Sequence, residues 1–223
     1  MRKIRLHRLV VTVLLLMVAG GLLGQSSRAT RARERLEMYE IPFTVDAFLE
    51  YVGKNNSEVV QRFVDAGIDV NAANAQGDRA LIIAAEKGSI KIVNILLKAG
   101  ANINIGDADG STALMYAAHF RKSKMVKHLI RRKADVNKQN KNQMTALMYA
   151  VIGGDIESIN EMLTKETNTE LKNIHGKTAI DIANDLGYNK VADYIKSKMD
   201  YLHNRQTPEK KQYELELKRL RRI

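Results

Sequence analysis

Small and apolar residues recur in this chain in pairs of short blocks, and both blocks have helical spacing. In ALIIAAEKG, which begins at Ala80, they fill about two helical turns before a glycine follows. In IKIVNILLKAG, which begins at Ile90, they fall at i, i+3, i+4 and i+7 and end at Gly100. This periodicity, closed each time by a residue that readily adopts positive φ, predicts two short helices joined by a turn.

The pair of blocks repeats every 33 residues, since TALMYA stands at 112–117 and again at 145–150. Two further slots are mostly glycine at the same step, with one exception in each: Gly77, Gly110, Gln143 and Gly176, and Gly88, Arg121, Gly154 and Gly187. Self-similarity at a fixed period predicts a repeat architecture, because helix pairs this short bury their apolar faces only by stacking on neighbouring copies.

The unit resembles the ankyrin repeat, whose signature reads roughly D-x-x-G-x-T-P-L-H-x-A-A-x-x-G and then I-V-x-x-L-L-x-x-G-A-D-V-N. Close matches begin at Asn74, Asp107, Asn140 and Asn173, and a more degenerate unit begins at Phe43. The resemblance implies an all-α ankyrin-repeat solenoid of about five helix-turn-helix units with short β-turn fingers. The expected units are 41–73, 74–106, 107–139, 140–172 and 173–199, of which the first and last would cap the stack.

Several positions depart from the family signature. Alanine replaces its proline at 80, 113, 146 and 179, and its histidine is replaced by Ile82, Met115, Met148 and Asp181. Lys133 and Glu166 occupy the slot of the helix-ending glycine, where a left-handed backbone costs a non-glycine residue roughly 1–2 kcal/mol. We therefore expect the third and fourth units to be locally less stable. The pattern does not assign Tyr116 and Tyr149, the tyrosines of the doubled motif, to the core or to the surface.

The two ends of the chain differ from the repeats. Four basic residues precede an uncharged apolar run from Leu9 to Leu23, which is the layout of a secretory signal. We expect cleavage between 24 and 29; an uncleaved membrane anchor over 1–24 is the alternative, and both place the repeats outside the cytoplasm, in the periplasm or the extracellular space. The compact signal favours a bacterial source. Residues 25–40 are expected as a basic, helical linker, and 200–223 as a charged helical tail.

Composition narrows the class of function. The chain has 223 residues, 45% hydrophobic and 27% charged, which is typical of a folded protein. It has no cysteine, so disulfides and thiolate metal sites are excluded. Its five histidines lack metal-ligand spacing, and phosphate-loop, serine-elbow and HExxH motifs are missing. We therefore expect no catalytic residues, no metal, no cofactor and no small-molecule substrate.

Candidate contact residues follow from the ankyrin resemblance. The fingertips would be Gln76, Asp78, Asp109, Ser111, Asn142, Met144, His175 and Lys177. The concave helix positions would be Glu86, Lys87, His119, Phe120 and Ile152. Phe120, Met144 and Ile152 are apolar where water is expected, so they are the favoured contact anchors, with isolated exposed apolar residues as the plain alternative.

A basic strip lies in HFRKSKMVKHLIRRK, residues 119–133, which holds seven Lys or Arg and no acid. Its outward members are expected to be Lys124, Lys127, Arg131 and Arg132. They form either a solvated face or a surface attracted to anionic lipid or an acidic partner. The formal charge of +11 would suit nucleic acid, but the export signal argues against that partner.

Together these features predict a non-enzymatic, monomeric protein-binding module or scaffold outside the cytoplasm. One alternative is a membrane-anchored envelope structural protein. Another is an accessory subunit that supports a periplasmic enzyme. The identity of the partner does not follow from the residues, because contact positions on such a fold vary freely.

Overall fold

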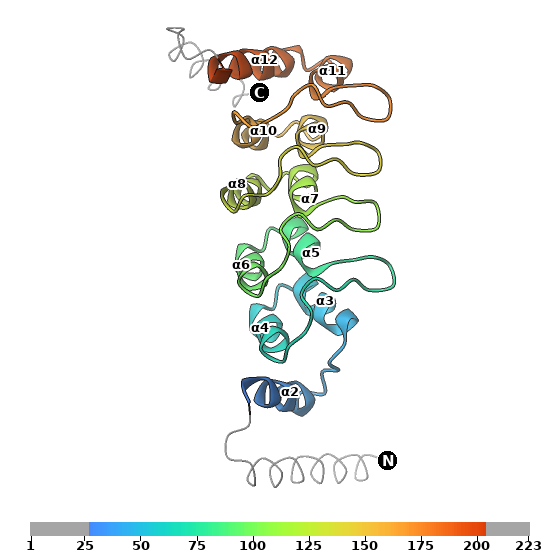
Figure 1. Cartoon of the computed structure of the whole chain (residues 1–223), viewed down its shortest axis with the longest axis vertical. Helices are drawn as coiled ribbons and strands as arrows, with labels where there is room; N and C mark the ends of the chain where they lie inside the picture. Colours follow the sequence, from blue (N-terminus) through green and yellow to red (C-terminus); the bar gives the residue numbers. More distant parts are fainter. Residues whose placement is uncertain (1–26, 204–223) are drawn as a thin grey trace. The chain divides into compact units, whose positions relative to one another are not determined.

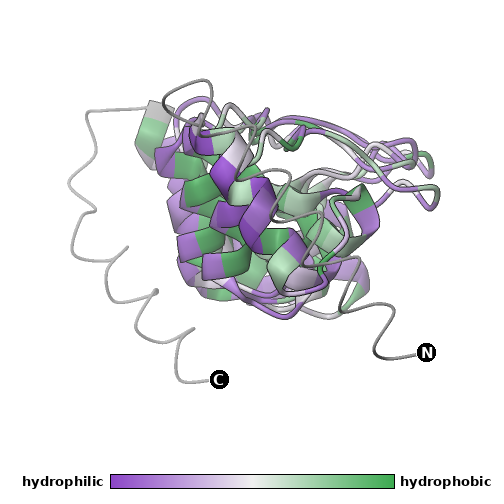
Figure 2. Cartoon of the chain, turned by 90° about the horizontal axis from the view of Figure 1, so that it is seen from below, coloured by the Kyte–Doolittle hydropathy of each residue, from purple (hydrophilic) through white to green (hydrophobic). Residues whose placement is uncertain are grey.

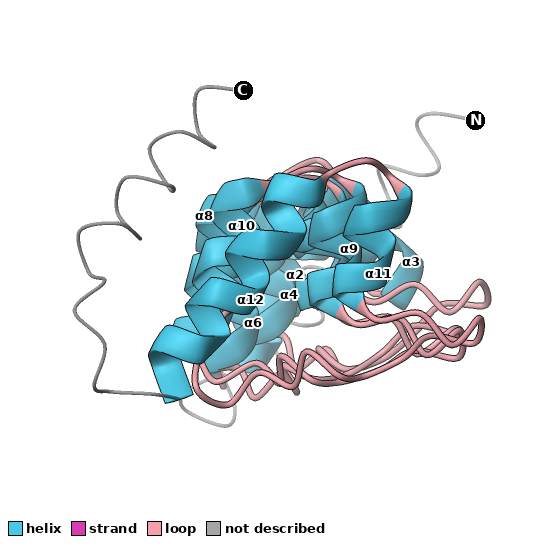
Figure 3. Cartoon of the chain, turned by 90° about the horizontal axis from the view of Figure 1, so that it is seen from above, coloured by secondary structure: helices cyan, strands magenta, loops and turns pink. Residues whose placement is uncertain are grey.

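Every regular element in residues 27–203, which are the residues that the computed structural model describes, is an α-helix (Figure 3). Contacts divide the chain into two units, Met1–Asp69 and Val70–Ile223. The expected signal or anchor over 1–24 and most of the expected tail, from 204 onward, lie outside the described residues. The predicted all-α repeat fold is confirmed.

The described part of the N-terminal unit holds three helices, α2 Arg28–Met38, α3 Val45–Gly53 and α4 Ser57–Asp65. Each is capped by the side chain before it, because an oxygen of Ser27, Thr44 or Asn56 accepts a backbone N–H from the first turn. Such caps satisfy donors that have no partner within the helix, and they fix where each helix begins.

Helix α2 covers most of the segment expected as a basic linker. The prediction that this segment is helical is confirmed, but the helix also packs against α4. Leu36 is 1% exposed, and Arg33 Nε donates to the Ala66 carbonyl at 3.1 Å. The core of the unit includes Phe48 and Phe63, whose ring centroids lie 5.6 Å apart. The segment is thus an integral helix of the N-terminal unit.

The described part of the C-terminal unit, which ends at residue 203, contains four helix pairs in series: α5 Ala80–Glu86, α6 Ile90–Lys98, α7 Ala113–His119, α8 Ser123–Arg131, α9 Ala146–Ile152, α10 Ile156–Met162, α11 Ala179–Asp185 and α12 Asn189–His203. The first helices of the pairs, α5, α7, α9 and α11, stack in one row, and the second helices stack in another (Figure 1). The helices carry apolar and polar bands, and the loops between pairs extend to one side as fingers (Figures 2 and 3).

The doubled TALMYA motif is largely packing and capping. Thr112 Oγ1 accepts the Met115 N–H at 3.4 Å, and Thr145 caps α9 in the same way. Ala113, Leu114 and Ala117 are buried. In the last pair, the unusual residue Asp181 completes the cap by accepting the Thr178 N–H at 2.9 Å. This hydrogen bond holds the pKa of the Asp181 carboxyl below its ordinary value.

The glycine slots keep their backbone conformation where another residue fills them. Gln143 has φ of 55° and Arg121 has φ of 54°, close to the left-handed values of the glycines at the same step. Lys133 has φ of 66°, as its slot predicts. The expectation for Glu166 is wrong, because α10 already ends at Met162 and the backbone at Glu166 is not left-handed. A turn in which Thr167 Oγ1 accepts the Thr164 N–H at 3.0 Å replaces the glycine-type ending.

Asparagines tie the finger of each pair to the next pair. The side-chain oxygens of Asn71, Asn104 and Asn137 each accept a backbone N–H 31 residues further along, from Asn102, Asp135 and Asn168, at 2.8 Å in all three cases. The three asparagines are themselves 33 residues apart. These bonds fix the spacing of successive fingers and therefore hold the contact positions in register.

Candidate protein-binding surface

The fingers are rigid because an Asn or Asp at the base of each one holds the turn. Asp107 Oδ1 accepts the N–H groups of Asp109 and Ser111, both at 2.9 Å. Asn140 Oδ1 accepts those of Asn142 and Met144 at 3.0 and 2.9 Å. The same pair of bonds recurs in the first and last fingers of this unit, at Asn74 and Asn173. Residues near the tips are therefore presented in fixed positions.

The tyrosines left unsettled by the sequence connect the first helices to these finger bases. The Tyr116 hydroxyl donates to Asp107 Oδ2 at 2.8 Å, and the Tyr149 hydroxyl accepts from Asn140 Nδ2 at 3.1 Å. Burial, and then the hydrogen bond to Asp107, raise the pKa of Tyr116 well above its ordinary value. Both hydroxyls are engaged by the fingers, so the rings are oriented along the first-helix row.

Four aromatic side chains, from α7, from Phe120 directly after it and from α9, come together beside the fingers. The ring centroids of Tyr116 and Phe120 lie 6.3 Å apart in a stacked arrangement. The His119 ring meets Phe120 at 5.0 Å and Tyr149 at 5.5 Å, edge to face in both contacts. Such offset and perpendicular arrangements suit the charge distribution of aromatic rings.

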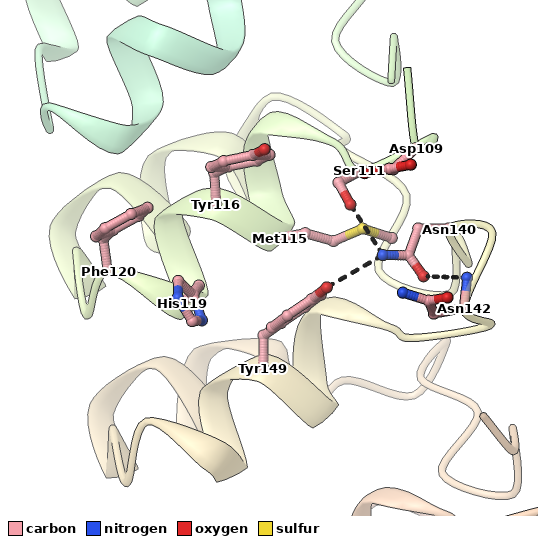
Figure 4. A pocket seen from close by; sticks show the side chains of 9 residues that line it. All are labelled: Asp109, Ser111, Met115, Tyr116, His119, Phe120, Asn140, Asn142 and Tyr149. Atoms are coloured by element: carbon pink, nitrogen blue, oxygen red, sulfur yellow. Dashed lines mark hydrogen bonds between the residues drawn. The ribbon is translucent and has the colours of Figure 1, made fainter. Parts of the chain in front are cut away.

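These rings line an open cavity of about 330 Å³, which we call the aromatic cavity (Figure 4). Its lining residues are Asp109, Ser111, Met115, Tyr116, His119, Phe120, Asn140, Asn142 and Tyr149. Two successive helix pairs and two successive fingers contribute to it. Sequence reasoning named Asp109, Ser111, His119, Phe120 and Asn142 as contact residues, but it missed the role of both tyrosines.

Most of the predicted contact residues, including several that line the cavity, lie at the surface. Phe120 and Ile152 are each 43% exposed, and Glu86 is half-buried. The remaining exposed members are Gln76, Asp78, Lys87, Asp109, His119, Asn142, His175 and Lys177. Of the three favoured apolar anchors, therefore, two present a large part of their side chains to solvent.

Two predicted contact residues are less exposed than a contact position requires, which corrects the expectation for them. Ser111 is 7% exposed, and its hydroxyl accepts from Asn140 Nδ2 at 2.9 Å, so it belongs to the buried base of the fingers. Met144 is half-buried, with its sulfur 3.6 Å from Asn173 Nδ2. In both cases a residue of the next unit covers the side chain, and such cover does not follow from the pattern within one unit.

The structure changes which residues form the basic strip. Lys124, Arg131 and Arg132 are exposed, but Lys127 is half-buried and forms an ion pair with Glu161 of α10. Arg132 donates to Asn94 Oδ1 at 2.7 Å. The strip is extended instead by α6, where the exposed residues Lys91 and Lys98 stand one repeat before Lys124 and Arg131. Positive charge is thus concentrated on the outer side of α6 and α8.

Partly buried polar contacts join neighbouring second helices. Asn94 Oδ1 lies 3.0 Å from His128 Nε2, and the pKa of His128 is lowered by burial and then by the nearby Arg132 and Arg131. Two repeats further along the chain, between α10 and α12, Asn160 Oδ1 accepts from the Tyr194 hydroxyl at 2.6 Å. The Asn160 carbonyl accepts from Lys198 Nζ, also at 2.6 Å, and burial lowers the pKa of Lys198 to about 8.

A second, larger cavity of about 700 Å³ lies at the turns between the helices of the last two pairs. Gly153, Gly154 and Lys190 line it, together with Tyr188, whose side chain is 41% exposed. Sequence reasoning did not identify this cavity. Within residues 27–203, no group of three or more His, Cys, Asp or Glu could hold a metal ion. None of the helices in this range has both the length and the apolar character needed to cross a membrane.

Comparison with known proteins gives one family. A family model described as ankyrin repeats, in three copies, matches residues 48–140 and 114–206. These two matches overlap and together extend from the first pair of repeat helices to the end of α12. A comparison with curated proteins gave no match.

Proposed function

Because the chain belongs to the ankyrin repeat family, whose repeats are generally protein-interaction modules, we propose that it is a non-enzymatic binding module or scaffold. Its contact surface is formed by the fingers and the first-helix row of the C-terminal unit. It acts as a monomer on a protein partner, with no role for nucleic acid, a cofactor or a small-molecule substrate.

The aromatic cavity is the observation that carries this proposal. Phe120, at the edge of the cavity, is 43% exposed, and Ile152 of α9, the next helix in the same row, is equally exposed. Exposed apolar and aromatic side chains on a rigid scaffold, with polar residues around them, are typical of the centre of a protein interface. The hydrogen bonds at the finger bases keep this surface in one conformation, which reduces the entropy lost on binding.

A photo-crosslinking experiment tests the contact surface. The photoreactive residue p-benzoylphenylalanine is introduced in the full-length chain at Phe120, and in a control variant at Lys98 on the outer side of α6. Irradiation of the source cells is expected to give a discrete protein adduct from the first variant only. The adduct is expected to be lost when the tip residues Gln76, Asp109, Asn142 and His175 are exchanged with one another. Equal products from both positions, or none, contradict the proposal.

Placement outside the cytoplasm is a further part of the proposal, supported by the basic and apolar pattern of residues 2–23. A fusion of the chain to alkaline phosphatase, which is active only after export, tests it. We expect strong activity from the intact chain. The control is the same fusion with Leu14, Leu15 and Leu16 changed to Asp. We expect little phosphatase activity from it. If a fusion to β-galactosidase, which is active in the cytoplasm, is active and the phosphatase fusion is not, the placement outside the cytoplasm is overturned.

A second candidate function is attachment to an anionic envelope surface, and the basic outer side of α6 and α8 favours it. Lys91, Lys98, Lys124 and Arg131 are all exposed there. Electrostatic attachment is screened by salt, so high salt should release the protein from membranes, whereas an inserted anchor requires detergent. An accessory role for a periplasmic enzyme would instead appear as one enzyme that remains bound through purification.

A further inference from the structure

We propose that the aromatic cavity binds an arginine side chain of the partner protein. This inference rests on the proposed function and names the chemistry that the contact surface recognises. It goes beyond the general use of fingers and helix rows, because it assigns one cavity and one kind of side chain.

The charge of the cavity is opposite to that of the whole chain. The chain has a formal charge of +11, but none of the Lys and Arg residues within 27–203 lines the cavity. Asp109 is an exposed carboxylate on its wall, and Asp107 lies behind Tyr116, whose hydroxyl donates to it. A cationic group entering here would meet acceptors and avoid the repulsion that it meets elsewhere on this basic protein.

The aromatic rings suit a planar cation. The Tyr116 and Phe120 rings are stacked with 17° between their planes, and His119 stands at 87° to Phe120. A guanidinium group can stack on a ring face and also donate two hydrogen bonds to a carboxylate, which an ammonium group cannot do in the same plane. Arginine is therefore favoured over lysine.

The tyrosine hydroxyls are already used by the fingers. Tyr116 donates to Asp107, and Tyr149 accepts from Asn140. The two tyrosines therefore offer mainly ring surface to an incoming group. Met115, which is 1% exposed, forms the floor of the aromatic cavity. A cavity of about 330 Å³ with this fixed lining has room for one long side chain.

Repeat packing alone does not require these aromatic residues. In the preceding unit, the positions of Tyr116 and Phe120 are occupied by Ile83 and Lys87. One unit after Tyr149, the equivalent residue is Ile182, and the position of Phe120 becomes Gly153 and then Leu186. The fold is maintained at all these positions with other side chains. The cluster is therefore a local feature of α7 and α9 rather than a property of the repeat.

A random 12-residue peptide library displayed on phage and selected on the immobilised full-length protein tests the inference. We expect the selected peptides to share an arginine at one position. A synthetic copy of one such peptide is then compared with copies carrying citrulline or lysine at that position. Citrulline keeps the shape but removes the charge, so it should weaken binding about tenfold, and lysine should weaken it less.

Matched variants of the protein locate the site. Phe120→Ala and Asp109→Asn are each expected to weaken binding of the peptide about fivefold. Met38→Ala and Asp193→Asn are the controls, since Met38 is 62% exposed on α2 and Asp193 is an exposed carboxylate on α12, and neither lines the cavity or belongs to the predicted contact residues. Both controls should stay within about twofold of the unchanged protein. Circular dichroism confirms that each variant is folded.

Several results would overturn the inference, and they are distinguishable from failure of the proposed function. Peptides without a common arginine whose binding is lost in Phe120→Ala leave the binding module intact but reject arginine. Arginine peptides that bind Phe120→Ala and Asp109→Asn normally reject the cavity. If no peptide is selected, the inference fails; if the photo-crosslinking at Phe120 also gives no adduct, the proposed function fails with it.

Discussion

The Asn140 amide donates to the Tyr149 hydroxyl at 3.1 Å, nine residues away, and joins the base of a finger to the helix that follows it. The equivalent residues one repeat earlier, Asp107 and Tyr116, form the same connection with the direction of donation reversed. The two copies of one hexapeptide therefore make the same contact with an acid in one case and an amide in the other. Each tyrosine therefore connects a finger to a first helix, whether its hydrogen-bond partner is a carboxylate or an amide.

Loss of the Tyr116 hydroxyl should destabilise the protein. Tyr116→Phe keeps the ring but removes the donor to Asp107, so the free energy of unfolding should fall by about 1 kcal/mol. Urea denaturation measures this change. Tyr188→Phe is the control, because Tyr188 is 41% exposed and should change stability by less than about 0.5 kcal/mol. Equal effects of the two substitutions would show that the bond to Asp107 contributes nothing.

The asparagine bonds between successive fingers are also testable. Asn137 accepts the Asn168 N–H at 2.8 Å and donates to the Glu166 carbonyl at 2.7 Å. Asn137→Ala removes both bonds, so we expect a loss of about 1–2 kcal/mol in urea denaturation. Gln76→Ala, at an exposed fingertip, should be close to neutral. Hydrogen exchange at the Asn168 amide should also become faster in Asn137→Ala, and unchanged exchange would contradict the assignment.

Glycine should stabilise the protein at one of two equivalent repeat positions. Lys133 has φ of 66°, so Lys133→Gly removes side-chain strain and is expected to raise stability by about 0.5–1 kcal/mol. Glu166 occupies the same slot one repeat later but is not left-handed, so Glu166→Gly should be neutral or destabilising. Thermal unfolding of the two variants gives the comparison. Stabilisation by both substitutions would contradict the different backbone at Glu166.

Stability should depend on pH through Lys198. Its folded-state pKa is lowered from 10.5 to about 8, so between these values the unfolded chain binds more protons than the folded protein. The penalty for burying the charged form is complete below pH 8 and is relieved as the pH rises towards 10.5. Relative to Lys198→Met, stability of the unchanged protein should therefore increase across this window, by up to about 3 kcal/mol.

Urea denaturation of both proteins at pH 7.5, 8.5 and 9.5 measures this difference. The comparison cancels the titration of the other lysines and tyrosines, which both proteins share. Lys190→Met, at an exposed position of the same helix, serves as the matched control and should follow the unchanged protein. Parallel curves for the unchanged protein and Lys198→Met would sink the assignment of a lowered pKa.

The period in the sequence was sufficient to predict most of the helical framework. It places the threonine caps, and it identifies Gln143 and Arg121 as residues in glycine slots, where the backbone is indeed left-handed. A 33-residue pattern records what each unit needs for its own folding and stacking. For that reason it predicts secondary structure and buried positions well.

Contacts that depend on the identity of residues in the next unit could not be predicted. Ser111 is buried because Asn140 of the next finger reaches its hydroxyl. The aromatic cavity exists because Tyr149 of α9 faces His119 of α7. Both cases are decided by side chains from the next unit. At Glu166 the pattern fails for a different reason, because Thr164 and Thr167 of the same unit make an alternative turn after α10 ends at Met162.

The asparagine bonds at Asn71, Asn104 and Asn137 all connect a residue to the backbone 31 positions later, and they use identical atoms each time. If a whole unit were inserted or deleted, the units on either side of the change would therefore still form the same asparagine-to-backbone hydrogen bond. Gene duplication of one 33-residue segment could lengthen the binding surface without new joining contacts. The protein is in this sense extensible, and its reach could evolve in steps of one finger.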